Sequence, residues 1–177
     1  MGVLGIDHRH IFGQLASMKK TGAVGTKWWT RGEITGKSND FTDEFPELQH
    51  VGSPDEILDD PEIDLVLIAA IPAERAEFAI AAMLAGKDVM TDKPGCTTLA
   101  QLDAIKQTVA ETGRIWSIDF SERFEVEAVT KAAELVQAGR IGKVVQTIGM
   151  GPHRTNHPSR PSWFYDDAKY GGILCDI

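Results

Sequence analysis

Apolar positions along this chain fall into two alternating patterns, short continuous runs and longer stretches with helical spacing. The clearest run spans residues 64–71 and is apolar at every position after Asp64, as a strand covered by helices on both faces requires. Similar short runs predict strands over 3–6, 24–29, 88–91 and 115–120. Helices are predicted over 11–18, from Ser53, over 72–84 and over 98–113. This alternation predicts an α/β fold built on a doubly wound parallel sheet.

The pattern changes after residue 120. We therefore expect a first domain over 1–120 and the beginning of a second, α+β domain over 121–177, which is incomplete. A helix from Val126 that ends at Gly139 and a strand over 143–148 are predicted for the second part. Residues 30–40 and 149–169 are rich in polar residues and turn formers, and both are predicted to be loops.

Composition and charge exclude several classes of protein. A net charge of −8 and a pI near 5.1 argue against a nucleic-acid surface, which would normally be basic. No apolar run approaches the length that crosses a membrane. Two cysteines, Cys96 and Cys175, do not suggest a disulfide framework. We therefore expect a cytoplasmic protein with neither a nucleic acid nor a membrane as partner.

A lysine before a proline marks the most informative stretch of the chain. Lys93 precedes Pro94, and a residue before proline is driven into extended geometry. Lys93 should therefore stand at the carboxyl end of the strand over 88–91. In open α/β sheets that edge is where ligands bind.

The stretch 85–94, A-G-K-D-V-M-T-D-K-P, resembles the signature of the glucose–fructose oxidoreductase, inositol dehydrogenase and rhizopine catabolism family (Gfo/Idh/MocA). Asp88 stands where the family usually has His, and Asp92 where it has Glu. The segments 64–68, 123–124, 139–144 and 171–177 match in the same order, whereas Ala76 replaces a frequent histidine. The resemblance implies an NAD(P)-dependent oxidoreductase that transfers hydride between nicotinamide and a secondary alcohol of a sugar, polyol or related small molecule. It also implies a homo-oligomer for the full-length protein.

The loop after the first strand keeps only part of the dinucleotide fingerprint G-x-G-x-x-G. Its three positions hold Gly5, Asp7 and His10, so only the first glycine is present. Asp7 would repel a pyrophosphate unless it caps the helix or Arg9 offsets its charge. His8 and His10 shape a turn or a cofactor loop in preference to a metal site, because the sequence shows no third ligand nearby. The resemblance assigns the following residues to the cofactor: Gly5, Asp7, His8, His10, Ile11, Ala70, Pro72, Asp92 and Lys93.

The end of the second strand bears on which nicotinamide cofactor is used. An acid that holds the adenosine ribose is expected about 20 residues past the fingerprint. Thr30 and Arg31 occupy that place, and a hydroxyl with a guanidinium suits a 2′-phosphate. The sequence thus favours NADP over NAD. The alternative is that Arg31 is an ordinary solvated residue and that Glu33 takes the acidic role.

The resemblance also implies the catalytic residues. The role of the family lysine near the nicotinamide and the substrate hydroxyl falls on Lys93, and that of the Asp in G-G-x-x-x-D falls on Asp176. The family's proton-accepting histidine would fall just past Ile177, so we expect the 177-residue chain alone to be inactive. Residues in the part that corresponds to the substrate domain are candidates for substrate binding, although a solvated loop is an equal alternative: Arg123, Arg154, His157 and Trp163.

Two other functions compete with the dehydrogenase interpretation. Some members of the family retain NAD and use it for glycoside cleavage through transient oxidation. The altered loop at Asp7 and His10 could instead mark a non-catalytic binding or regulatory protein. Cys96 lacks a paired base and is not expected to act as a nucleophile.

Overall fold

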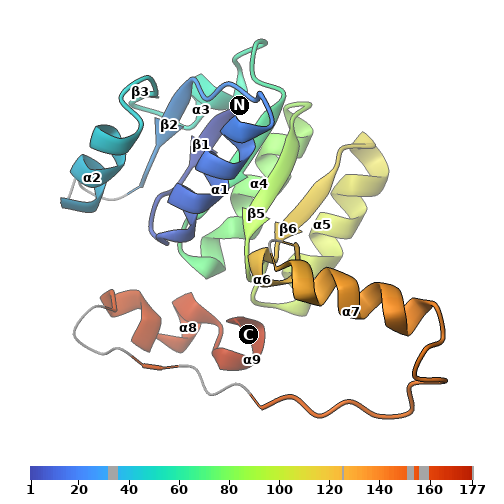
Figure 1. Ribbon diagram of the computed structural model, residues 1–177. Coiled ribbons are helices and arrows are strands. Elements are labelled where there is room, and N and C mark those ends of the chain that lie inside the picture. Colours follow the sequence, from blue (N-terminus) through green and yellow to red (C-terminus); the bar gives the residue numbers. More distant parts are fainter. Residues whose placement is uncertain (32–35, 125, 151–153, 156–159, 177) are drawn as a thin grey trace. The chain divides into compact units, whose positions relative to one another are not determined.

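A computed structural model of residues 1–177 describes the chain except residues 32–35, 125, 151–153, 156–159 and 177. Six parallel strands form one sheet in the order β3-β2-β1-β4-β5-β6 (Figure 1), which confirms the predicted parallel sheet, although the short strand β3 was not predicted. The strands are β1 (Gly2–Leu4), β2 (Lys27–Trp29), β3 (Gln49–His50), β4 (Leu65–Ile68), β5 (Asp88–Asp92) and β6 (Trp116–Asp119). The order reverses between β1 and β4, the kind of point at which doubly wound sheets bind ligands.

Helices separate the strands along the chain, and further helices follow β6. They are α1 (His10–Lys20), α2 (Gly36–Glu44), α3 (Asp55–Leu58), the 3-10 helix η1 (Pro72–Glu74), α4 (Arg75–Leu84), α5 (Leu99–Thr112), α6 (Ser121–Phe124), α7 (Glu127–Gln137), the 3-10 helix η3 (Ser162–Tyr165), α8 (Asp167–Tyr170) and α9 (Ile173–Asp176). None of the helices in the described ranges is both long enough and apolar enough to cross a membrane.

Alternate residues of the central strand β4 belong to two separate cores. On β4, Val66 and Ile68 belong to the core that is shared with α3, α4 and α5. Leu67, between them, belongs to the core that is shared with α1 and α2. Successive side chains on a strand point to opposite faces, so a run that is apolar at every position needs helices on both sides. The structure confirms that prediction for residues 65–68.

Helix ends follow the signals in the sequence. The Thr98 hydroxyl accepts a hydrogen bond from the Gln101 amide, and the Thr98 amide donates to the side-chain oxygen of Gln101. These two bonds form a complete capping box at the start of α5. Gly113 ends the same helix in the left-handed conformation, with φ of 67°.

The chain forms two compact units, residues 1–119 with 162–177, and residues 120–161. The first unit contains the sheet, its helices and the segments η3, α8 and α9. The second contains α6 and α7, and α7 ends before Gly139 as expected, with φ of 70° at that glycine. The assignment of 121–177 to a second domain of the full protein stays a prediction.

Three predicted segments differ from the structure. Residues 30–40 were expected to be loop, but α2 begins at Gly36. Its Phe41 packs edge-on against Trp28 and Phe12, with ring centroids 5.3 and 5.4 Å apart, so burial of an aromatic side chain outweighs the weak local preference.

The strand expected over 143–148 is irregular and exposed, because a strand needs a hydrogen-bonded partner and none lies beside it among the described residues. The loop expected over 149–169 includes η3 and most of α8.

Candidate active site at the carboxyl edge of the sheet

The turn from β1 into α1 packs directly against the end of β4. Gly5 has φ of 77°, and a Cβ at this position would lie 2.5 Å from the Cα of Ala70. The Gly5 amide donates to the Trp29 carbonyl at 2.8 Å, and the His8 amide donates to the Ala69 carbonyl at 3.0 Å. Only glycine fits position 5, both for its backbone angle and for the close approach of β4.

Asp92, the last residue of β5, gathers three side chains around its carboxylate. His10 Nδ1 lies 2.8 Å from Oδ1, and His8 Nδ1 lies 3.0 Å from Oδ2. Arg75 Nη2 donates to Oδ2 at 3.0 Å. The carboxylate is completely buried, and these three partners replace the water that it loses on folding.

Arg75, a residue that the sequence reasoning missed, fastens the ends of β4 and β5 together. Its guanidinium is fully buried and donates to the carbonyl oxygens of Ala70 at 2.7 Å, Asp92 at 2.9 Å and Pro94 at 3.0 Å. The signal was present in the sequence: Arg75 precedes Ala79 by one helical turn, so a charge is in register with the apolar face of α4. A charge at such a position needs a buried partner.

Burial and charge set the protonation of this cluster. Burial would raise the pKa of Asp92, but hydrogen bonds from His10 and His8 and the charge of Arg75 outweigh it and lower that pKa. Burial lowers the pKa of His8, although Asp92 acts in the opposite direction. Asp92 is thus an ionised acceptor, so Nδ1 of each imidazole carries the hydrogen and each Nε2 faces away from the carboxylate.

Lys93 and Asp176 meet although 83 positions separate them in the sequence. Lys93 Nζ donates to Asp176 Oδ1 at 2.8 Å, and the Tyr170 hydroxyl donates to Oδ2 at 2.7 Å. All three side chains are buried. Burial would raise the pKa of Asp176, but the hydrogen bonds from Lys93 and Tyr170 outweigh it and lower that pKa. The structure therefore brings together the two residues that the resemblance marks as catalytic, and it adds Tyr170.

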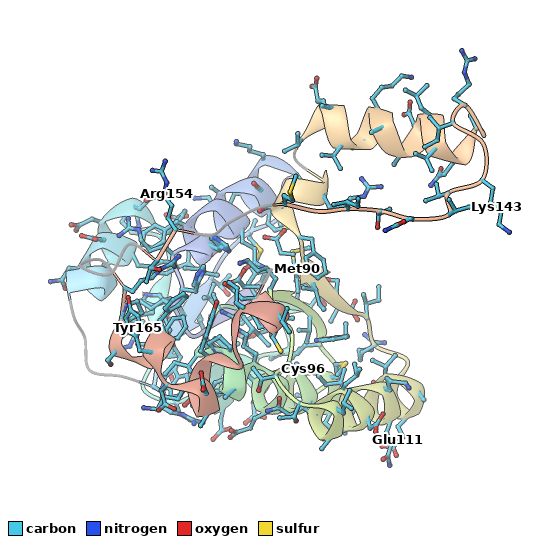
Figure 2. All side chains as sticks on the ribbon, turned by 90° about the horizontal axis from the view of Figure 1, so that it is seen from below. Met90, Cys96, Glu111, Lys143, Arg154 and Tyr165 are labelled. Carbon is cyan, nitrogen blue, oxygen red and sulfur yellow. The ribbon has the colours of Figure 1, made fainter. Side chains whose placement is uncertain are left out.

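The segment that carries Tyr170 and Asp176 packs at the same edge (Figure 2 shows its side chains, with Tyr165 labelled). Trp163 on η3 is buried, with its ring centroid 6.3 Å from that of His8 and 6.4 Å from that of Tyr170. Of the four candidates for substrate binding, Trp163 is thus placed beside the cluster.

The other three candidates for substrate binding lie in the second unit or outside the described residues. Arg123 and Arg154 are exposed and belong to the unit of residues 120–161. His157 lies outside the described residues. Their roles stay predictions.

Arg31 at the end of β2 already has two acidic partners. Its guanidinium lies 3.2 Å from Glu74 Oε1 and 3.3 Å from Glu77 Oε1, and it covers the ring of Phe78. The side chain is 48% exposed, so it is accessible to a ligand. Glu33, the alternative acid, lies outside the described residues.

The remaining cofactor candidates differ in exposure. Ile11 and Ala70 are buried, and the Ile11 side chain belongs to the core that is shared with α1 and α2. Pro72 is buried at the start of η1. Asp7 and Thr30 are partly exposed.

The fold supplies the third potential metal ligand that the sequence did not show. One ligand atom each from His8, His10 and Asp92 lies within 4.8 Å of the others. However, Arg75 occupies Oδ2 of Asp92 and would repel a divalent cation, and both Nδ1 atoms donate to the carboxylate. The cluster fits a hydrogen-bonded support for the β1–α1 turn better than a metal centre.

The edge fits a dinucleotide in several respects. Gly5 allows close packing of the turn, and α1, a helix of 11 residues, begins at His10 beside it. A pyrophosphate at that helix terminus would meet His8 and His10, whose Nε2 atoms face away from Asp92.

Comparison with known proteins identifies the family. The model of the Gfo/Idh/MocA oxidoreductase family, described as an NAD-binding Rossmann fold, matches residues 33–120. A solved structure from Erwinia carotovora atroseptica SCRI1043, assigned to the oxidoreductases, is 43% identical with a TM-score of 0.93 and covers 99% of this chain and 52% of that one. The chain belongs to the Gfo/Idh/MocA family.

Two further proteins similar to this chain have NAD⁺ or NADP⁺ in their names. A scyllo-inositol 2-dehydrogenase (NAD⁺) of Bacillus subtilis is 35% identical over 123 residues, which are 70% of this chain and 34% of that protein. The biliverdin reductase of Synechocystis sp. PCC 6803, solved with biliverdin and NADP⁺, is 24% identical with a TM-score of 0.70 and covers 98% of this chain and 53% of that one, a likeness that shows the fold alone. The chain spans about a third to a half of the length of these proteins. The description of the Gfo/Idh/MocA family as NAD-binding supports a nicotinamide cofactor for this chain, but not which one.

Proposed function

We propose that the protein transfers hydride between a nicotinamide cofactor and a secondary alcohol of a sugar, polyol or related small molecule. The observation that carries the proposal is the Lys93–Asp176 pair, 2.8 Å between Nζ and Oδ1, buried at the carboxyl edge beside the β1–α1 turn. A bound nicotinamide would supply the hydride acceptor or donor.

The chain's own residues would orient and stabilise the reacting alcohol. The Lys93 ammonium has three hydrogens and uses one on Asp176, so it can donate to a substrate hydroxyl as alkoxide charge develops. Asp176 fixes the direction of that ammonium, which converts a flexible lysine into a positioned donor.

The test is made in the full-length protein and compares Lys93→Met with Lys106→Met, an exposed lysine of α5 whose nearest carboxylate, Asp103, lies 3.9 Å away. Reduction of NAD⁺ or NADP⁺ is followed with a panel of inositols and aldoses, and cofactor affinity is measured by calorimetry. We expect Lys93→Met to lower kcat/KM by at least about 100-fold, the cost of one charged donor in the transition state, whereas Lys106→Met leaves it unchanged. An unaltered kcat/KM in Lys93→Met would refute the proposal.

We also propose that Arg31 favours NADP, because it is an accessible guanidinium at the end of β2. Glu74 and Glu77 would then share the Arg31 guanidinium with the 2′-phosphate. Arg31→Ala should lower the ratio of NADPH to NADH affinity, and an unchanged ratio would exclude this role. A cofactor that co-purifies and is never released would favour the glycoside-cleaving alternative, and binding of neither cofactor would favour a regulatory protein.

We further propose that the protein works in the cytoplasm on a small molecule and forms a homo-oligomer at full length. The unpaired state of Cys96 and Cys175 agrees with a reducing compartment. Size-exclusion chromatography with light scattering on the full-length protein tests the oligomer.

A further inference from the structure

Tyr170 makes a contact that neither the sequence motif nor the relatives assign. Its hydroxyl donates to Asp176 Oδ2 at 2.7 Å, while Lys93 Nζ donates to Oδ1 at 2.8 Å. The exposed fractions are 6% for Tyr170, 7% for Asp176 and 8% for Lys93. Each oxygen of the carboxylate therefore has its own donor, in surroundings from which water is largely excluded.

A tight turn brings position 176 back onto position 170. Asp166 caps α8 by accepting from the Ala168 amide, and the helix ends at Gly171 with φ of 81°, followed by Gly172 with φ of 85°. Both values lie in the left-handed region that glycine adopts without strain. The two glycines thus reverse the chain between the phenol and the carboxylate that it contacts.

The same turn is fastened to the segment that follows Lys93. A Cβ at Gly171 would lie 2.6 Å from Cγ2 of Thr97, so the α8–α9 turn packs closely against the start of α5. The Tyr170 ring is also fixed, with its centroid 4.3 Å from that of Phe164. The packing of Gly171 against Thr97 and of the Tyr170 ring against Phe164 thus fixes the phenol independently of its hydrogen bond.

We propose that Tyr170 is a positioning residue that fixes the Asp176 carboxylate and keeps it ionised, so that Asp176 in turn directs Lys93. Without the hydroxyl, Oδ2 is a buried acceptor with one donor fewer, and the carboxylate can rotate or take up a proton. A protonated Asp176 no longer attracts the Lys93 ammonium. The consequence for catalysis rests on the proposed function, but the consequence for the carboxylate does not.

Asp176 responds to four groups on different elements. Lys93 at the end of β5 and Tyr170 on α8 contact it directly, and the charges of His8 in the β1–α1 turn and Arg75 on α4 act on it from farther away. Of these, only Tyr170 can lose its hydrogen bond without a change of charge. Tyr170→Phe therefore isolates the hydrogen bond from the electrostatic field.

The chain offers a matched control. It has two tyrosines, and Tyr165 on η3 is 48% exposed and lies five positions before Tyr170. Tyr165→Phe makes the same chemical change away from Asp176.

The first readout is the titration of Asp176 in chain labelled with ¹³C-carboxyl aspartate, with Asp176→Asn to assign the signal. We expect Tyr170→Phe to raise the pKa of Asp176 and Tyr165→Phe to leave it in place. An unmoved Asp176 signal in folded Tyr170→Phe would overturn the proposal, whatever the enzyme's activity.

The second readout is the dependence of kcat/KM on pH in the active protein. Loss of a hydrogen bond to a charged group corresponds to about a 10- to 100-fold lower kcat/KM on the acidic side, with recovery as pH rises. Absence of turnover in the full-length wild-type protein, together with a shifted Asp176 signal in Tyr170→Phe, would refute the proposed function and leave the role of Tyr170 intact.

A third measurement serves if Tyr170→Phe does not fold. Tyrosine absorbance near 295 nm follows ionisation of both phenols in folded wild type and Asp176→Asn. We expect the Asn variant to ionise the Tyr170 phenol at lower pH, because the neighbouring negative charge is gone. Identical titration curves for wild type and Asp176→Asn would overturn the proposal.

Discussion

Replacement of Arg75 by methionine tests the claim that one buried guanidinium joins the ends of β4 and β5. Methionine keeps a long apolar chain but removes every donor. The substitution leaves the Asp92 carboxylate without its cationic partner and takes a hydrogen bond from the carbonyls of Ala70 and Pro94. All of these groups are in the interior, so water does not replace the donor.

The magnitude follows from that burial. Removal of one partner of a buried ion pair costs about 3–5 kcal/mol, because the other charge stays uncompensated. The free energy of unfolding of natural domains is about 5–15 kcal/mol, so a large share would be lost. With a urea slope of about 2 kcal/mol/M, the unfolding midpoint should fall by about 1.5–2.5 M.

The assay is urea unfolding followed by circular dichroism at 222 nm, with Arg114→Met as the matched control. Arg114 is 42% exposed, and its nearest carboxylate, Asp88, is 4.0 Å away, so its replacement should cost at most about 1 kcal/mol. The double variant Arg75→Met/Asp92→Asn should be less destabilised than the sum of its single variants, because it removes both charges. Equal stability losses for Arg75→Met and Arg114→Met would refute the reasoning.

Three further predictions concern other parts of the first unit. Gly5→Ala should lower the free energy of unfolding by about 1–3 kcal/mol in the same urea assay, since its Cβ would lie 2.5 Å from Ala70. Gly22→Ala is the control for backbone strain alone, because Gly22 has a positive φ but nothing within 4 Å of its Cβ position. Equal losses of stability in the two variants would contradict the packing argument. Thr98→Ala should cost about 0.5–2 kcal/mol through loss of the capping box of α5, and a cost within the error of the measurement would show that the cap is dispensable. The pKa values of Asp92 and Asp176 are lower in the folded chain than the ordinary 3.8 of an unfolded chain. The two ionised carboxylates therefore stabilise the fold fully at pH values above 3.8, and this stabilisation is lost as the pH falls below 3.8. Thermal melts from pH 6 to pH 3 should show that loss, with a smaller loss in Asp176→Asn than in wild type.

Local pattern determined much of the fold. A run that is apolar at every position, as at 65–68, can be satisfied only by cover on both faces, and it predicted the doubly wound sheet. The capping box at Thr98 and the left-handed Gly113 are local interactions within one or two turns, and the sequence located them correctly. Strand 143–148 failed for the converse reason, since a strand depends on a partner that its own residues do not specify.

The active-site contacts were decided by tertiary structure. Pro94 and the resemblance placed Lys93 at a sheet edge, and the motif pointed to Asp176, but the 2.8 Å contact between them joins residues 83 positions apart. Tyr170 lay one residue outside the motif. Arg75 was in register with the apolar face of α4, which indicated a buried charge but not which groups would pair with it. The cofactor role of Asp92 stays a prediction, and the sequence did not show that the fold surrounds its carboxylate with His8, His10 and Arg75. Periodicity reports which face of an element is buried, but only the packing of distant elements determines which buried polar groups must pair.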